Sequence, residues 1–349
     1  MRLQQLIPRY RAAFEQRYGH RTTAQQRAAL SAIVDCRSER YGKLQLHCQG
    51  CQLDQFAYQS CGHRSCPGCH HHDTVQWLAR QQQKLLPVNY FMVTFTLPAQ
   101  LRPLVWSEQK DLYALLFQCA SATLKRFANN HKQLSGDLGM TAVLHTHSRK
   151  LDYHPHVHLV VPAIALSPQR RQWKKLRGRY LFKANALANV FRGKFLEGLS
   201  ALGLRQPPNT PAQWVAHCKH VGRGLPALKY LSRYLYRGVI SEKNILDDDG
   251  ENIRFRYTDS DTGKSVVRTV AGETFLWLIS QHALPKGFRR VRDYGILHGN
   301  AKKTRYLLQS ALSVRLPVSE TSARPAWPCR HCGHDLRVRA FIPPPWRTG

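Results

Sequence analysis

Two pairs of cysteines carry the plainest chemical signature in this sequence. Cys48 and Cys51 form one CxxC pair, and after fourteen intervening residues Cys66 and Cys69 form another. A CxxC pair places two thiolates on one tight turn, and two such pairs complete the tetrahedral shell that Zn²⁺ prefers. The spacing therefore predicts one zinc site made of these four cysteines. A closed four-thiolate site has no open position for catalysis, so we expect it to be structural.

Further sulfur and imidazole donors accompany these pairs. Cys36, Cys61 and His63 fall in the same stretch, so a second zinc ion, or another choice of ligands, stays open. Cys329 and Cys332 form a third CxxC pair, which on its own is half a zinc site. The start of the chain shows no secretory leader, and cytosolic thiols stay reduced, so we expect metal ligation rather than disulfides.

The segment from His154 to His158 predicts a metal site of a different kind. Residues two apart in a strand point to the same face, so His156 and His158 can hold one ion while the residue between them packs on the other side. His145 lies on the preceding predicted strand and is a candidate third ligand. A histidine in a strand is often a satisfied core residue, but here a further histidine precedes the pair and an apolar run follows it.

Two tyrosines one helical turn apart are the third candidate feature. Tyr230 and Tyr234 occupy positions i and i+4, which lie on one face of a helix. A phenol is a sound nucleophile toward phosphorus when a metal polarises the phosphate. Lys229, Arg233 and Arg237 are near enough in sequence to hold phosphates. The alternative is an aromatic stripe that packs into a core.

The balance of charge indicates a polyanionic partner. The 349 residues include 52 Lys and Arg against 21 Asp and Glu, which gives a net charge of +31. Most of these basic side chains lack an internal acidic partner, and such a surface binds nucleic acid by releasing counterions. The alternatives are a solvated basic surface or an anionic membrane. A hydrophobic fraction of 43% indicates a folded protein, and no apolar run is long enough to span a membrane.

The pattern of apolar residues places these groups on an α+β framework. Helices are expected over residues 3–18, 23–36, 73–86, 107–129, 179–202 and 225–237. A buried strand is expected over 90–98, a β-hairpin over 140–147 and 156–161, and a second hairpin that turns at 260–263. The sequence thus divides into a helical, cysteine-rich region (1–86), a central core (87–250) and an extension with a hairpin and a loose, proline-rich tail (251–349).

Taken in order along the chain, these motifs resemble the IS91-type transposases, which are rolling-circle enzymes of the HUH endonuclease superfamily. The likeness is carried by the phrases SCGHRSCPGC, YFMVTFTLP, VLHTH, LDYHPHVHLVVP, LKYLSRYLYRGVIS and LPKGFRRVRDYGIL, and it covers nearly the whole chain. It implies a ferredoxin-like HUH nuclease core with an antiparallel sheet over residues 87–250, preceded by a helical zinc-binding module.

The resemblance also implies a function and its partners. His156 and His158, with a third ligand, would bind catalytic Mg²⁺ or Mn²⁺, and Tyr230 or Tyr234, or both, would form a 5′-phosphotyrosine with single-stranded DNA. Transposon ends and target DNA would be the substrates, a host helicase would assist, and the protein would act at the nucleoid in a bacterial cytoplasm. A plasmid replication initiator or relaxase would share this chemistry. A zinc-dependent DNA-binding protein with structural histidines and tyrosines would bind DNA without cleaving it.

Overall fold

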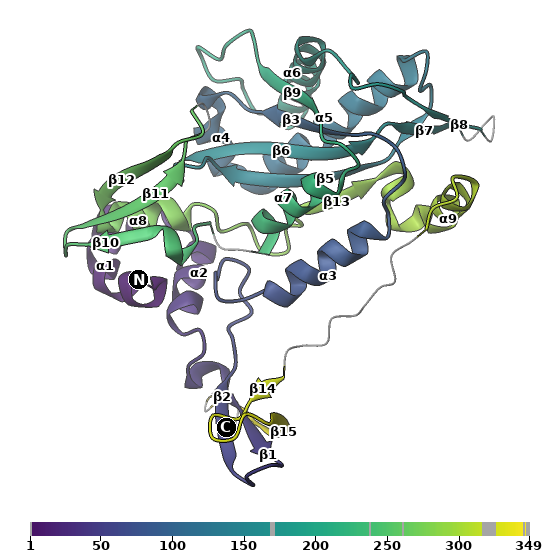
Figure 1. The fold of residues 1–349 in the computed structure, drawn as a ribbon. Helices are drawn as coiled ribbons and strands as arrows, with labels where there is room; N and C mark the ends of the chain where they lie inside the picture. Colours follow the sequence, from purple (N-terminus) through teal and green to yellow (C-terminus); the bar gives the residue numbers. More distant parts are fainter. Residues whose placement is uncertain are drawn as a thin grey trace.

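The protein is built around a five-stranded antiparallel sheet. A computed structural model describes residues 2–167, 172–236, 239–259, 262–315, 326–344 and 346, apart from the side chains of Arg233, Tyr234 and Tyr236. The strands lie in the order β13-β5-β6-β3-β9 (Figure 1). Their bounds are Tyr90–Thr96 for β3, Met140–His147 for β5, Tyr153–Pro162 for β6, Val215–His220 for β9 and Val291–Tyr294 for β13. The predicted buried strand and the first predicted hairpin are thereby confirmed.

Helices cover both faces of this sheet. On one face lie α5 (Gln109–Asn130) and α6 (Ala184–Ala201), after the short α4 (Arg102–Ser107) (Figure 1). On the other face lie α3 (His71–Gln82) and α7 (Leu225–Tyr236). Alternation along the strands explains both layers: Val157 and Leu159 of β6 pack toward α5 and α6, whereas Val160 packs toward α7. The face that carries α7 is the face to which the even-numbered residues of β6 point.

The first two helices form a second core with elements from much later in the chain. Here α1 (Leu3–Tyr18) and α2 (Ala24–Val34) pack with α8 (Gly272–Ser280) and with the sheet of β10 (Ile245–Asp248), β11 (Asn252–Thr258) and β12 (Ser265–Ala271). Phe14 and Phe275 are fully buried in this core. Thr23 is the N-cap of α2 and forms a capping box with Gln26; the sequence alone leaves the cap open between Thr22 and Thr23. Helix α8, which lies beyond residue 250, packs on α1 in this core. The domain boundaries at residues 86 and 250 stay predictions.

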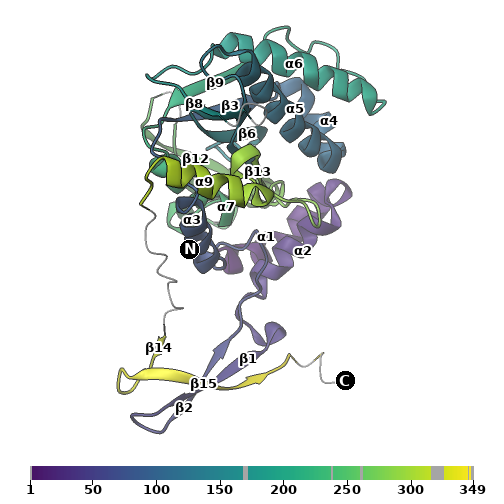
Figure 2. The same ribbon diagram turned by 90° about the vertical axis from the view of Figure 1, so that its right-hand side faces the viewer.

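A small sheet stands apart from both cores, at the lower end of the molecule in Figures 1 and 2. It pairs β1 (Lys43–Cys48) and β2 (Asp54–Tyr58) with β14 (Trp327–Pro328) and β15 (Asp335–Ile342), in the order β14-β15-β1-β2. The prediction of a loose tail was therefore wrong over residues 326–344. Its many prolines suggested irregular chain, but β15 has alternating residues that pair with β1.

The remaining elements are peripheral. β4 (Asp137–Leu138), β7 (Ile164–Ser167) and β8 (Gln172–Lys175) make a third small sheet, and α9 (Lys302–Ala311) follows β13. Helix α6 begins later than the predicted residue 179, because Leu181 and Phe182 are buried in non-helical chain before it, with the ring centroid of Phe182 5.3 Å from that of Phe127. Within the described ranges, no helix is both long and apolar enough to cross a bilayer.

Candidate active site and metal centres

Three histidines of the central hairpin meet on one face of the sheet. The register of β5 and β6 sets His145 opposite His156, and His158 lies two residues further along the same face. The imidazole nitrogens that could bind a metal in these three side chains lie within 4.8 Å of one another. The sequence predicted the pair on β6, and the strand pairing brings the candidate third ligand to it.

Hydrogen bonds fix the orientation of two of these rings. His156 donates through Nδ1 to the backbone oxygen of His154, at 2.6 Å, and Arg102 in turn donates to Nδ1 of His154, at 2.8 Å. Nδ1 of His158 bonds Oγ1 of Thr94, at 2.8 Å. With Nδ1 of both rings engaged, Nε2 is the nitrogen that each can offer to a metal. Such partners hold ligand rings in place and raise their basicity.

Burial keeps the three imidazoles neutral. It lowers the pKa of His145 and of His156 well below the ordinary histidine value, and the neighbouring imidazoles lower both further. Burial also lowers the pKa of His158 to about 4. A neutral imidazole keeps the lone pair that a metal needs. Three such donors fit a divalent transition-metal ion, whereas Mg²⁺ prefers oxygen ligands and fits this set less well.

Tyr230 faces the histidines from helix α7. Its ring centroid lies 6.0 Å from that of His158 and 6.5 Å from that of His145. All four side chains line one cavity of about 750 Å³. Buried leucines, among them Leu231, hold α7 against the sheet. The side chain of the second predicted tyrosine, Tyr234, lies outside the part that the structure describes.

The start of α7 is brought close to strand β3. Gly224, the residue before the helix, has a left-handed φ of +89°, and a Cβ there would lie 2.7 Å from Cγ of the buried Tyr90. A side chain at this position would be strained and would displace the tyrosine ring. This close approach sets the helix, and with it Tyr230, over the histidine face of the sheet.

Of the three basic residues that the sequence indicated, the structure describes the side chain of Lys229 alone, and it lies outside the cavity. Lys229 is exposed on α7 and is not among the residues that line the cavity, the side chain of Arg233 is not described, and Arg237 lies outside the described residues. Arg149 and Arg256 line the cavity instead. Arg149 could have been predicted, because it lies with Lys150 in the loop 148–152, which joins the two histidine strands.

A second pocket continues this basic surface. It measures about 250 Å³ and shares Arg149, His154 and Tyr257 with the larger cavity. Arg102 and Lys150 add two more positive charges to its wall, and Asp152 and Asp259 add two carboxylates. The combined surface has an excess of positive charge beside the histidines, which suits a chain of phosphates.

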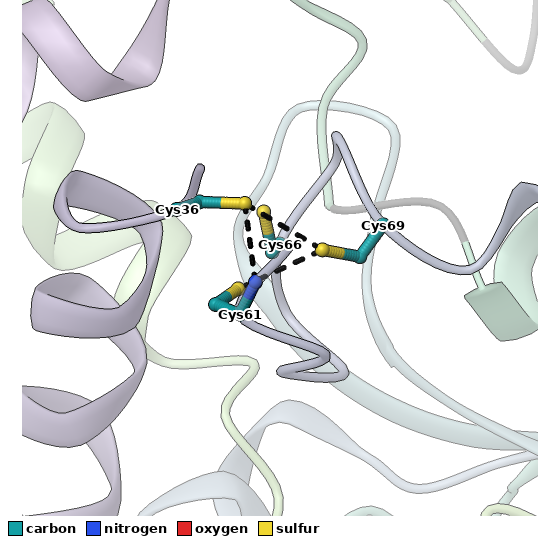
Figure 3. Close-up of side chains that lie close together, drawn as sticks. All are labelled: Cys36, Cys61, Cys66 and Cys69. Atoms are coloured by element: carbon teal, nitrogen blue, oxygen red, sulfur yellow. Dashed lines mark hydrogen bonds between the residues drawn. The ribbon is translucent and has the colours of Figure 1, made fainter. Parts of the chain in front are cut away.

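The cysteines form two groups of four, and not in the predicted combination. Cys66 and Cys69 meet Cys36 and Cys61, with Sγ of Cys69 3.7 Å from that of Cys36 and 3.6 Å from that of Cys61 (Figure 3). Cys36 follows directly on helix α2 and is buried in the core that this helix shares with α1. His63 is in neither group; its Nδ1 accepts the Ser65 N–H in the turn after Cys61.

The other group joins the two ends of the chain. Cys48 and Cys51 meet Cys329 and Cys332, and the four Sγ atoms lie within 4.8 Å of one another. The predicted site of Cys48, Cys51, Cys66 and Cys69 was therefore wrong, because hairpin β1–β2 carries its CxxC pair away from the loop that holds the other. Four sulfurs at such separations fit the tetrahedral shell of Zn²⁺ in both groups.

Comparison with known proteins identifies the family. A family model described as "Transposase zinc-binding domain" matches residues 4–97, and one described as "Putative transposase" matches residues 139–305. "Putative transposase y4qJ" of Sinorhizobium fredii is 33% identical over 344 residues, which cover 91% of this chain and 86% of that protein. "Transposase for insertion sequence element IS801" of Pseudomonas savastanoi pv. phaseolicola is 30% identical over 269 residues, 71% of this chain and 63% of that protein. The chain belongs to the IS91/IS801 family of transposases.

Proposed function

We propose that this transposase cuts and rejoins single-stranded DNA at transposon ends through a covalent tyrosine intermediate, as rolling-circle transposition requires. The observation that carries the proposal is the position of Tyr230 across one cavity from His145, His156 and His158. A nucleophile and a cluster of metal ligands that face each other are the two components that this chemistry needs.

The arrangement of the core supports an HUH nuclease. Along the chain β3, α5, β5, β6, α6 and β9 follow one another as β-α-β-β-α-β, and in space the strands lie in the order β5-β6-β3-β9. With the smaller elements between them set aside, this order supports the proposed ferredoxin-like core. Its two helices lie on one face, which leaves the histidines on the other face, under α7.

The three histidines would hold Mn²⁺ or Mg²⁺, with a preference for Mn²⁺ because of their nitrogen donors. The bound ion would polarise the scissile phosphate. The phenol oxygen of Tyr230 forms the new bond to phosphorus and gives up its proton, while the bond from phosphorus to O3′ breaks and O3′ takes up a proton. The products are a 5′-phosphotyrosine and a free 3′-OH. Because one phosphodiester replaces another, the reverse reaction rejoins strands without ATP.

Basic side chains beside the site would hold the flanking phosphates. Arg149, Arg256, Arg102 and Lys150 line the two connected pockets, and the chain as a whole carries a net charge of +31. DNA is the partner that a transposase requires. A host helicase that supplies single strands, and action at the nucleoid in the bacterial cytoplasm, complete the proposal.

The experiment is a cleavage assay with labelled single strands from the ends of the element, in the presence of Mn²⁺. Wild type, Tyr230→Phe, Tyr234→Phe and the double variant are compared on denaturing gels. Tyr180→Phe is a matched control, because this tyrosine is 65% exposed and does not line the cavity. We expect a metal-dependent covalent adduct with wild type and Tyr180→Phe, and none with Tyr230→Phe.

Other outcomes would contradict parts of the proposal. An adduct that persists in Tyr230→Phe and disappears in Tyr234→Phe would identify Tyr234 as the nucleophile. Binding in gel shifts without an adduct on any strand would favour a zinc-dependent DNA-binding protein. Cleavage of plasmid-origin strands, but not of transposon ends, would favour a replication initiator or relaxase.

A further inference from the structure

The cysteine group formed by the two ends of the chain has the detailed geometry of a metal site. Sγ of Cys48 lies 3.4 Å from that of Cys332, and Sγ of Cys51 lies 3.6 Å from that of Cys329. All four cysteines are free thiols. Cys329 and Cys332 lie beyond both segments that match transposase family models, which end at residue 305.

The two CxxC turns have the same backbone hydrogen bonds. In the first, the N–H of Cys48 donates to the oxygen of Leu53 and its own oxygen accepts the N–H of Gln52. In the second, Cys329 donates to His334 and accepts from Gly333, which are the same five and four residues further along. Gln52 and Gly333 both have left-handed φ, at +60° and +76°.

Two unrelated sequence segments thus make the same turn around one point. In each turn the first cysteine makes the two backbone hydrogen bonds, and the second cysteine follows three residues later. Both sulfurs of one turn therefore lie next to the sulfurs of the other turn. N–H groups also approach the sulfur of Cys329, from the backbone of His331 at 3.4 Å and from Nε2 of Gln55 at 3.1 Å. Donors of this kind stabilise a thiolate.

The small sheet has little else to hold it together. Its buried side chains are Leu46, Leu336 and two of the cysteines themselves, Cys48 and Cys329. Units below about 40 residues usually need a metal or a disulfide, because they cannot bury enough apolar surface. The pairing of β15 with β1 therefore lacks a sufficient apolar core.

We propose that Cys48, Cys51, Cys329 and Cys332 bind a second zinc ion, and that this ion holds residues 326–344 on the β1–β2 hairpin. Binding releases the protons of the four thiols, and four Zn–S bonds form. The proposal goes beyond the DNA chemistry proposed above and does not depend on it, since neither the histidines nor Tyr230 take part.

A glycine substitution tests the contact between the two CxxC turns. Gly50 lies inside the first turn, and a Cβ there would lie 2.8 Å from Nδ1 of His334 and 3.3 Å from Sγ of Cys332, both in the second turn. Gly68 has the same place between Cys66 and Cys69, where a Cβ would lie at an ordinary 3.8 Å from the nearest atom, a sulfur. Gly50→Ala should displace the exposed His334 ring and crowd Sγ of Cys332, whereas Gly68→Ala should fit.

The experiment measures the zinc content of the purified full-length chain by mass spectrometry, together with hydrogen exchange of residues 326–344. Wild type should hold two zinc ions per chain at its two cysteine groups, besides any ion at the histidines. Cys329→Ser combined with Cys332→Ser should lose one zinc and the protection of residues 326–344, while residues 140–162 stay protected. Cys218→Ser, outside both cysteine groups, should keep both ions. Gly50→Ala should release one zinc to a chelator faster than Gly68→Ala.

The proposal fails if wild type holds a single zinc that Cys66→Ser removes and the Cys329/Cys332 variant keeps. It also fails if residues 326–344 stay protected after the second zinc has gone. Should the double serine variant not fold, Cys332→His decides, because a histidine ligand at this exposed position should keep two metal ions. Loss of one ion from Cys332→His, with protection of residues 326–344 unchanged, would overturn the proposed role.

Discussion

Removing the hydroxyl of Thr94 tests whether His158 is a metal ligand. Thr94 lies on β3 opposite His158, both side chains are 8% exposed, and Oγ1 is 2.8 Å from Nδ1. If Nε2 binds the metal, Nδ1 carries the proton and donates a hydrogen bond to Oγ1. Thr94→Val keeps the shape of the side chain but removes the acceptor, so the ring loses the partner that orients it.

The expected effect follows from that single bond. Loss of such a partner typically weakens metal binding by about 10–100-fold, which corresponds to about 1.4–2.8 kcal/mol. A buried donor left unpaired also costs about 1–3 kcal/mol of folding stability, and this loss applies with or without metal. Comparing the two quantities separates a role in metal binding from a general loss of packing.

The assay is titration with Mn²⁺ followed by calorimetry, with urea unfolding of the same samples. Thr94→Ser retains a hydroxyl and should bind Mn²⁺ nearly as wild type does. Thr96→Val is the matched control, since Thr96 lines the same cavity two residues away and faces His156 across the strands. Wild-type affinity in Thr94→Val, with only a loss of stability, would refute the inference that Nε2 of His158 binds the metal.

Three further predictions concern packing, capping and DNA contact. Gly198→Ala should destabilise the protein by about 1–3 kcal/mol in urea unfolding, because the added Cβ would lie 2.2 Å from a side-chain atom of Leu115. Gly193→Ala, on the same helix, adds a Cβ that meets nothing within 4 Å and should stabilise the protein by about 0.5–1 kcal/mol. Thr23→Ala should cost about 0.5–2 kcal/mol in the same measurement, because it removes the capping box of α2. Arg149→Gln should weaken binding of single strands of every sequence and reduce the slope of log affinity against log salt by about 0.7, and an unchanged slope would exclude a phosphate contact.

Much of the framework could be predicted from local patterns. The helix Leu3–Tyr18 is observed at its predicted bounds, and Thr23 is the N-cap of the helix that follows. The histidine hairpin was predicted because alternation and apolar flanks act over a few residues, and its pairing then brings His145 to His156 without further information. These features depend on contacts between close neighbours in sequence, which periodicity reports.

The grouping of the cysteines could not be predicted from local patterns. Each CxxC pair is a turn that its own spacing determines, so all six cysteines of the three pairs were recognised as potential ligands. Which pair meets which depends on β15 reaching β1 across almost the whole length of the chain, and no spacing reports that. The many prolines of this region led to the prediction of a loose tail, but they lie in the segments that flank β15 and not in the strand itself.

The sequence by itself determined the kinds of chemistry available: thiolates for zinc, imidazoles on one face of a strand, tyrosines on a helix, and a surplus of positive charge. The tertiary structure alone decided which of them lie together. It set Tyr230 over the histidines through the close approach of Gly224 to Tyr90, supplied Arg149 and Arg256 in place of Lys229, and divided eight cysteines into two groups. The physical reason is that residue type and local period act within one element, whereas a site is made by the packing of elements that are distant in sequence.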